Sequence, residues 1–348
     1  MLEKYSIEIL QSTGEAEWDE FILRQPQATY CHLAGWSQVL VQSYKMSCYF
    51  VQLRDGGQIA GVLPLIHVKG PIAPDRLVSM PFLDYGGVLS ASTEAEESIL
   101  DFAIDLVGRL GAKGLDLRAP LSDLGASTGE TSRYCFVLSL PDTGEELWKA
   151  VGPKVRNQIR KSEKSGLRTE AVDASSLPVF FGIFSKNMRD LGSPTHSMAF
   201  FRSLTKVMAE RCRLYLTYDD DDRPVAGGIA IRFRDTVTVP WASSLRSERS
   251  ACPNHSLYWR ILRDAQQQGA ESFDFGRSSV GTGTFHFKKQ WRAEARPLIW
   301  TFLDEHRHVE QDYYLKPQHG STAVRIWQKL PLSATIRLGP WIRHQLPN

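Results

Sequence analysis

The chain has 348 residues, of which 42% are hydrophobic and 23% are charged, a composition typical of a globular protein long enough for two domains. Its 41 basic and 39 acidic side chains give a net charge of +2, which argues against a dedicated nucleic-acid-binding protein but allows a local basic patch. The 5 cysteines are far apart and form no Cys-x-x-Cys pair, so the sequence indicates neither a disulfide framework nor a metal site and favours a reducing cytoplasm.

Similar elements recur in the two halves of the chain, which we interpret as an internal repeat. Trp36 and Phe200 begin similar predicted helices, and Cys48 and Cys212 begin similar predicted strands at the same spacing. Each copy reads as strand, helix, helix, hairpin of two strands, third strand, helix and strand, which predicts a mixed α/β fold. We place the first copy at residues 1–132, with an extra loop at Lys69–Arg76, and the second at residues 167–300.

A strand and a basic helix are predicted at residues 133–166, and we expect them to connect the two copies. The helix carries an apolar stripe with three- and four-residue steps, made of Leu147, Val151, Val155 and Ile159. Lys154, Arg156, Asn157 and Arg160 lie close together on its polar side. This side is either a solvated surface, as most runs of charge are, or a site for a diphosphate or anionic carrier, because guanidinium groups bind such oxygens in pairs.

In the second copy, residues 185–197 end a helix at a Gly-Ser-Pro break and collect polar side chains. Arg189 and Asp190 either bind a substrate or only pair with each other. His196 alone is more typical of a structural hydrogen bond than of a catalytic base.

The stretch Ser272–Trp291 is the strongest candidate for chemistry. Phe273 and Phe275 predict a buried strand that ends on Gly276, Arg277 and Ser278, and strand ends of this kind build sites. Phe285, Phe287 and Trp291 then surround Lys288 and Lys289, so we expect at least one ammonium in a partly apolar setting. If this segment is extended, the two lysines face opposite sides; for Lys288 to face a cleft, a turn or helix must begin at Phe287.

These residues resemble the late signature of the FemAB-like family, an aromatic-Asp-aromatic-Gly strand followed by a Phe-Lys-x-x-aromatic turn. The matching segments are Asp274-Phe275-Gly276-Arg277 and Gly283-Thr284-Phe285-His286-Phe287-Lys288-Lys289-Gln290-Trp291, with support from residues 154–161, 187–194 and 240–244. The resemblance covers nearly the whole chain and is greatest to the subgroup linked to exosortase (PEP-CTERM) and exopolysaccharide systems. It implies two acetyltransferase-like (GNAT) α/β domains in tandem and an acyltransferase or aminoacyltransferase.

The resemblance also suggests roles for residues. Because an oxyanion needs a cation where its charge develops, we assign catalytic roles to Lys288, which stabilises the oxyanion, and to Arg277 and Asp274. The resemblance places the substrate against Lys154, Arg156, Asn157, Arg160, Arg189, His196, Trp241, Ser278 and Phe287. Trp241 follows the strand that holds the acyl donor in acetyltransferases, so it either lines an acyl pocket or is a buried core residue.

The sequence leaves the acyl donor open between aminoacyl-tRNA and acyl-CoA, and no permanently bound cofactor is expected. Enzymes of this fold that use CoA carry a glycine-rich loop for the pyrophosphate, whereas residues 242–254 contain no glycine. The first copy has Gly86 and Gly87, but acidic residues follow them. Conventional CoA binding is therefore not expected in either copy.

The hypothesis from sequence is transfer of an acyl or aminoacyl group to an amine of an anionic, small or lipid-linked precursor of the cell envelope or of an exopolysaccharide. The alternatives are a CoA-dependent N-acetyltransferase and a non-catalytic accessory protein of polysaccharide assembly. With no signal peptide and no stretch of ~20 apolar residues, we expect a cytoplasmic protein. The tail, residues 301–348, either covers the second domain or rests on the inner face of the membrane.

Overall fold

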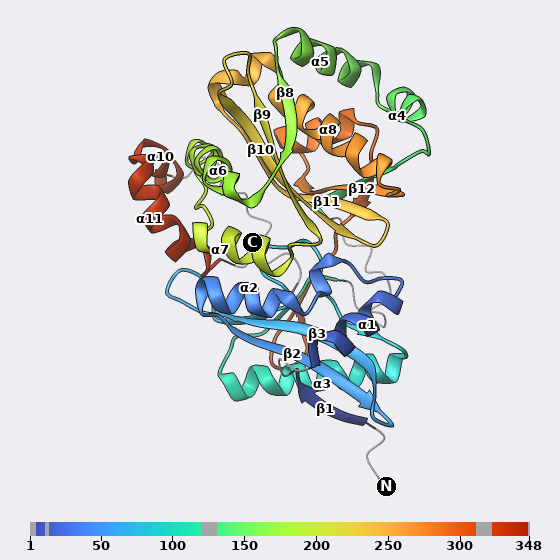
Figure 1. The fold of residues 1–348 in the computed structure, drawn as a ribbon. Coiled ribbons are helices and arrows are strands. Elements are labelled where there is room, and N and C mark those ends of the chain that lie inside the picture. The colour runs from blue at the N-terminus through green and yellow to red at the C-terminus, as the bar shows by residue number, and fades with distance from the viewer. Residues whose placement is uncertain (1–4, 11–13, 120–130, 311–321, 347–348) are drawn as a thin grey trace. The chain divides into compact units, whose positions relative to one another are not determined.

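The computed structural model describes residues 5–10, 14–119, 131–310 and 322–346 (Figure 1). The described residues form two compact units, each built on a mixed β-sheet with helices packed against it. The first unit takes residues up to 131 together with 298–310 and 341–346. The second takes residues 132–297 and 322–340.

The sheet of the first unit has the strand order β1-β2-β3-β4-β6-β14-β15, with β5 beside β3. Its long helix α3 begins at the N-cap Ser92, ends at Gly111, and packs its apolar face on β2 and β3. The elements of this unit are β1 (Tyr5–Ile9), α1 (Glu15–Arg24), η2 (Tyr30–His32), α2 (Gly35–Tyr44), β2 (Ser47–Asp55), β3 (Gln58–Val68), β4 (Arg76–Val78), β5 (Leu89–Ser90), α3 (Thr93–Leu110), β6 (Leu115–Leu117), β14 (Thr301–Leu303) and β15 (Val309–Glu310).

The sheet of the second unit has the strand order β13-β7-β12-β11-β10-β9-β8, and α8 packs on it through Leu257, Ile261 and Ala265. Its strands and helices up to α7 are β7 (Arg133–Ser139), α4 (Gly144–Ala150), α5 (Pro153–Lys164), β8 (Arg168–Val172), η3 (Ala174–Ser176), α6 (Leu177–Leu191) and α7 (Met198–Val207). The remaining elements are β9 (Cys212–Tyr218), β10 (Pro224–Phe233), β11 (Thr236–Ser244), η4 (Arg246–Ala251), α8 (Pro253–Gln267), β12 (Ser272–Ser279), α9 (Gly283–Gln290), β13 (Glu294–Pro297), α10 (Thr322–Lys329) and α11 (Leu332–Arg343), whose last residues belong to the first unit.

The two sheets share one topology, which confirms the prediction of two domains of the same fold. β1-β2-β3-β4-β6 and β8-β9-β10-β11-β12 are equivalent series in which only the last pair is parallel. The register of that pair also agrees, because Val78 lies opposite Asp116 and Thr238 lies opposite Asp274. The extra loop of the first copy is present as well, since β3 and β4 are joined by residues 69–75 and β10 and β11 only by residues 234–235.

The last strand of each series pairs with a strand from outside its own repeat. β12 pairs antiparallel with β7, which precedes the second copy in sequence. β6 pairs antiparallel with β14, which follows the second copy. β7 is therefore an inner strand of the second sheet rather than a connecting strand, and residues from 298 onward belong first to the first unit rather than to the second.

The tail is divided between the units, whereas we expected all of residues 301–348 to pack on the second domain. β14 and β15 extend the first sheet, while α10 packs on α6 through Gln328, which donates to the carbonyl of Asp190 at 3.2 Å. Residues 311–321 of the tail lie outside the described residues. None of the described helices is long and apolar enough to cross a bilayer.

Candidate active site

The neighbouring strands β11 and β12 of the second sheet separate partway along their length. Their parallel pairing joins Thr236–Thr238 to Ser272–Asp274, although β11 continues to Ser244 and β12 to Ser279. Beyond the shared stretch, β11 stays paired with β10 and β12 with β7. Beyond Thr238 and Asp274, each strand therefore has an edge that is not paired with the other strand. An extended ligand can form main-chain hydrogen bonds with these edges.

Both strands bulge where they separate. On β11 the bulge lies between Thr238 and Trp241, and on β12 it lies between Asp274 and Arg277. Gly276 occupies the second bulge with φ of 74°, a conformation that glycine adopts without strain, and its N–H donates to Asp274 Oδ1 at 2.7 Å. The buried Asp274 carboxylate thus supports the bend that presents Arg277, which makes it a positioning residue in this structure.

The first unit fills the equivalent place with its own chain. After β4 ends, Ser79 donates its N–H to the Asp116 carbonyl at 2.8 Å, and its Oγ accepts from the Arg118 N–H at 2.7 Å. Gly86 forms an antiparallel bridge with Arg118. The two copies therefore differ at this position. In the second copy, β11 and β12 both continue beyond the last residues at which they pair with each other.

Lys288 lies on helix α9, whose N-cap is Thr282. We expected that a turn or helix must begin at Phe287 for Lys288 to face a cleft, and the helix begins four residues earlier, at Gly283. The Lys288 side chain is 7% exposed and its Nζ donates to the Arg277 carbonyl of β12 at 2.8 Å. The neighbouring Lys289 is exposed. The segment is thus helical rather than extended, and Lys288 is the lysine directed toward the strand end.

The residues after the β12 bulge line the same strand end. Arg277 is half-buried, and Ser278 is buried with its Oγ donating to the Arg277 carbonyl at 2.9 Å. The carbonyl of Arg277 therefore accepts from both Lys288 and Ser278. This shared contact brings three of the predicted site residues together.

Aromatic side chains fix α9 on α8 and β12. Phe287 contacts His255 and Tyr258 with ring centroids 5.1 and 5.3 Å apart, and the fully buried Trp291 packs on Phe275. Burial, with the nearby Lys154 ammonium, lowers the pKa of His255 to about 4, so this ring is neutral near pH 7. Phe287 is thus part of the packing beneath Lys288, in line with the partly apolar setting expected for a lysine of this segment.

Trp241 belongs to a buried aromatic cluster. Its ring lies 5.4 Å from Phe200 and 6.0 Å from His196, and His196 stacks on Phe200 at 4.3 Å. Trp241 and His196 are both buried, and for Trp241 this is the core interpretation that the sequence left open. On the same strand, Ser243 Oγ accepts from Asn187 Nδ2 at 3.0 Å, which ties α6 to β11.

The basic residues of α5 divide between two faces of the helix. Arg156 turns toward α4, where its Nη1 donates to the carbonyls of Trp148, Lys149 and Val151 at 3.2, 3.3 and 2.7 Å. Arg160 lies over the Trp148 ring at 5.3 Å. The expected acceptor site at Arg156 is therefore corrected: this guanidinium holds the end of α4, because free carbonyls at a helix C-terminus attract a cation.

The other face of α5 adjoins the first turn of α8. The Cys252 thiol donates to Gln158 Oε1, and the Lys161 ammonium opposes the rise in the pKa of Cys252 that burial causes. Lys154 acts electrostatically on His255 in the same turn. Lys154, Gln158 and Lys161 follow a helical spacing of four and three residues, so they share one face of α5. They bring positive charge to a helix N-terminus, a place suited to phosphate.

Arg189 and Asp190 form a local ion pair, with Arg189 Nη2 2.7 Å from Asp190 Oδ1. This is the local pairing that the sequence left open as an alternative to substrate binding. In the described part of the chain, no three His, Cys, Asp or Glu side chains gather as metal ligands.

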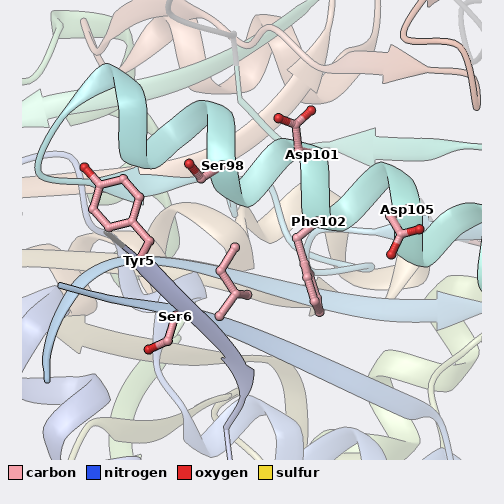
Figure 2. Close-up of a pocket in the computed structure, with 7 residues that line it drawn as sticks. Tyr5, Ser6, Ser98, Asp101, Phe102 and Asp105 are labelled. Atoms are coloured by element: carbon pink, nitrogen blue, oxygen red, sulfur yellow. The ribbon is translucent and has the colours of Figure 1, made fainter. Parts of the chain in front are cut away.

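An open groove of about 730 Å³ lies in the first unit (Figure 2). It is lined by Tyr5 and Ser6 of β1 and by Ser98, Asp101 and Phe102 of α3. Its carboxylates are already paired, Asp101 with Arg307 and Asp105 with Arg109 at 2.9 Å. We therefore place the chemistry at the separated strands of the second unit and not in this groove.

Comparisons with known proteins agree with the fold. Residues 153–289, from α5 to α9, match the family described as acetyltransferase (GNAT) domain. No curated protein matches the chain. Among solved structures, FemX is similar with a TM-score of 0.65 and 15% identity over 85% of this chain and 96% of FemX.

Two further structures show the same arrangement. A tandem GNAT protein from the clavulanic acid biosynthesis pathway has a TM-score of 0.55 and 12% identity, covering 86% of this chain and 98% of its own. The C-terminal domain of a putative lysylphosphatidylglycerol synthetase from Agrobacterium fabrum has a TM-score of 0.51 and 12% identity, covering 83% and 91%. The chain is therefore a tandem GNAT-fold protein, and residues 153–289 in its second unit match the acetyltransferase (GNAT) domain family, as expected for an acyltransferase.

Proposed function

We propose that the second domain transfers an acyl or aminoacyl group from an activated ester or thioester to an amine of an anionic cell-envelope or exopolysaccharide precursor. The observation that carries this proposal is the separation of β11 from β12, with the buried Lys288 ammonium held at the end of β12. The name of one structural neighbour, a lysylphosphatidylglycerol synthetase, and the likeness to FemX support aminoacyl transfer as the reaction class.

The chemistry requires one nucleophilic substitution at a carbonyl. The acceptor amine attacks the ester or thioester carbon, a C–N bond forms, and the carbonyl oxygen becomes an oxyanion. Collapse of this tetrahedral intermediate breaks the bond to the donor's oxygen or sulfur, which leaves with the proton lost by the amine. Lys288 supplies positive charge to the oxyanion, Arg277 and Ser278 position the substrate, and Asp274 acts through the bulge at Gly276.

The donor is either an aminoacyl-tRNA or an acyl-CoA, and both carry phosphates. The first turn of α8, with Lys154 and Lys161 beside it, is suited to such a phosphate even though residues 242–254 lack glycine. Asn157 and Arg160, which are exposed on α5, are proposed to contact the anionic acceptor. We place the reaction in the cytoplasm, at the inner face of the membrane when the acceptor is lipid-linked.

A transfer assay tests the proposal. The purified protein is incubated with an amine-bearing nucleotide-linked envelope precursor and, in parallel, with a pool of charged tRNA or with acetyl-CoA. We expect the acceptor to gain the mass of one aminoacyl or acyl group with one of the two donors, and a thermal shift with that donor alone. Turnover with acetyl-CoA alone identifies the N-acetyltransferase alternative. If neither donor is consumed with amine acceptors of either class, the protein is the accessory protein that the sequence left as an alternative.

A further inference from the structure

The helices α10 and α11 carry only positive charge. From Thr322 to Leu346 the sequence contains Arg325, Lys329, Arg337 and Arg343 and no aspartate or glutamate. The chain as a whole nearly balances its charges, with a net value of +2. These two helices, red in Figure 1 beside α6, are therefore a local basic element on a nearly neutral protein.

One face of each helix is attached to the second unit. Val324 packs against Gly192, where an added Cβ would lie 2.4 Å from its side chain, and Gln328 donates to the Asp190 carbonyl. On α11, Thr335 and Gly339 are buried, and Gly339 lies so close to Thr195 that an added Cβ would meet its N at 2.9 Å. These contacts fix which side of the helices faces away from the protein.

The opposite face presents large apolar side chains to solvent. Ile326 is 57% exposed, Leu338 is 46% exposed and Trp341 is 54% exposed. Leu338 and Trp341 are three residues apart and so share one side of α11. Two of these side chains have basic neighbours: Arg325 and Lys329 flank Ile326, and Arg337 precedes Leu338.

We propose that this outer face of α10 and α11 docks on an anionic phospholipid bilayer, with Ile326, Leu338 and Trp341 entering the interface. Basic side chains around an apolar stripe, with a tryptophan at the polar boundary, are what an interfacial helix requires. A nucleic acid would use the cations but would gain nothing from exposed isoleucine and leucine. The inference does not depend on the acyl transfer proposed above.

Vesicle flotation with the full-length protein tests it. We expect the protein to float with vesicles of phosphatidylcholine plus phosphatidylglycerol, to float poorly with phosphatidylcholine alone, and to be released by salt. The variant with Ile326→Ser, Leu338→Ser and Trp341→Ser is expected to bind about tenfold or more weakly. Leu23→Ser, at a side chain that is 43% exposed on α1, is the matched control and should bind as the wild type.

Two further measurements keep the result interpretable. The melting temperature of the triple variant should match the wild type, because the three side chains are exposed, and Arg325→Glu with Lys329→Glu should abolish the preference for phosphatidylglycerol. Equal flotation with both lipid mixtures, unchanged binding of the triple variant, or binding to a tRNA mixture in place of vesicles would each overturn the proposal. A failed transfer assay leaves flotation unaffected, so the two proposals fail separately.

Discussion

At the scale of single residues, Lys288 and Lys289 are neighbours of the same type with opposite environments. Helix α9 turns Lys288 onto the Arg277 carbonyl and leaves Lys289 in solvent. The sequence placed a lysine in an aromatic setting, but it could not choose between the two, because the choice depends on whether residues 283–290 are helical or extended. Thr282, which caps the helix through the Phe285 N–H, was the local signal for a helix.

Exchanging these lysines separately tests the catalytic assignment. If the Lys288 ammonium stabilises charge that exists only in the transition state, Lys288→Met lowers turnover by roughly 10²–10³-fold and leaves KM nearly unchanged. Lys289→Met is the control and should retain wild-type rates. The measurement is steady-state acyl transfer by both variants, and near-equal rates would remove lysine catalysis from α9.

Arg156 is expected to matter for stability. Arg156→Ala removes a charged donor from three carbonyls at the end of α4, so we expect the free energy of unfolding to fall by about 1–2 kcal/mol. Arg160→Ala, which removes one exposed contact with Trp148, should change it by less than about 0.5 kcal/mol. Urea unfolding of both variants decides the point; equal losses would mean that the α4 contact contributes nothing of its own.

At the scale of elements, the separation of β11 and β12 rests on two bulges. Gly276→Val forces a β-branched residue to φ of 74°, so we expect the bulge to flatten and turnover to fall by tenfold or more. Gly276→Asn should keep more activity, because asparagine tolerates that conformation better. The measurement is kcat for the two variants, together with their melting temperatures, which separate unfolding from a misplaced Arg277. An active valine variant would show that the bulge is not needed.

The face of α5 beside α8 gives a prediction about the donor. Lys154→Ala with Lys161→Ala removes two positive charges next to the first turn of α8, so we expect KM for the donor to rise by about tenfold while kcat changes little. Lys164→Ala, an exposed lysine of the same helix, is the matched control. A raised KM for the acceptor instead of the donor would reassign this face.

The spacing of apolar residues predicted these elements as helix or strand, but it did not predict which strands pair with each other. The apolar stripe of α5 is buried at Val155 and Ile159 as predicted, and the helix begins at Pro153. The alternation at residues 136–140 also predicted a strand, and β7 spans Arg133–Ser139. Its place between β12 and β13 could not be predicted, because alternation reveals that a strand has a buried face but not which strands lie on either side.

At the scale of the whole molecule, the repeat predicted the succession of five strands along each copy. It could not predict how two further strands pair. β7, which follows the first copy in sequence, pairs with β12 of the second sheet, and β14, which follows the second copy, pairs with β6 of the first sheet. A search for internal similarity compares each copy with its equivalent, and β7 and β14 lie outside both copies. The boundary drawn at 132 coincides with the start of the second unit, whereas residues 298–310 return to the first unit instead of packing on the second.

Ending the chain after Pro297 should damage the first unit and spare the second sheet. The first sheet loses β14, which buries Phe302 and Leu303 against β6, whereas every strand of the second sheet is retained. We expect limited proteolysis to cut within residues 5–119 of the shortened chain while residues 132–297 resist. A chain ending after Glu310 keeps β14 and β15 and is the control; equal protease resistance of the two would show that β14 is dispensable.

The exchange of β7 and β14 also sets the order in which the protein can be completed during synthesis. All strands of the second sheet have left the ribosome's active centre by Pro297, but β6 has no partner on its outer side until Thr301–Leu303 are made. At translation rates of about 5–20 residues per second, β6 waits roughly ten seconds or more with an unpaired edge, which is the kind of edge that other chains can add to. The half of the protein that is translated first is therefore the half that finishes folding last, and a chaperone's protection is needed there rather than at the end of the chain.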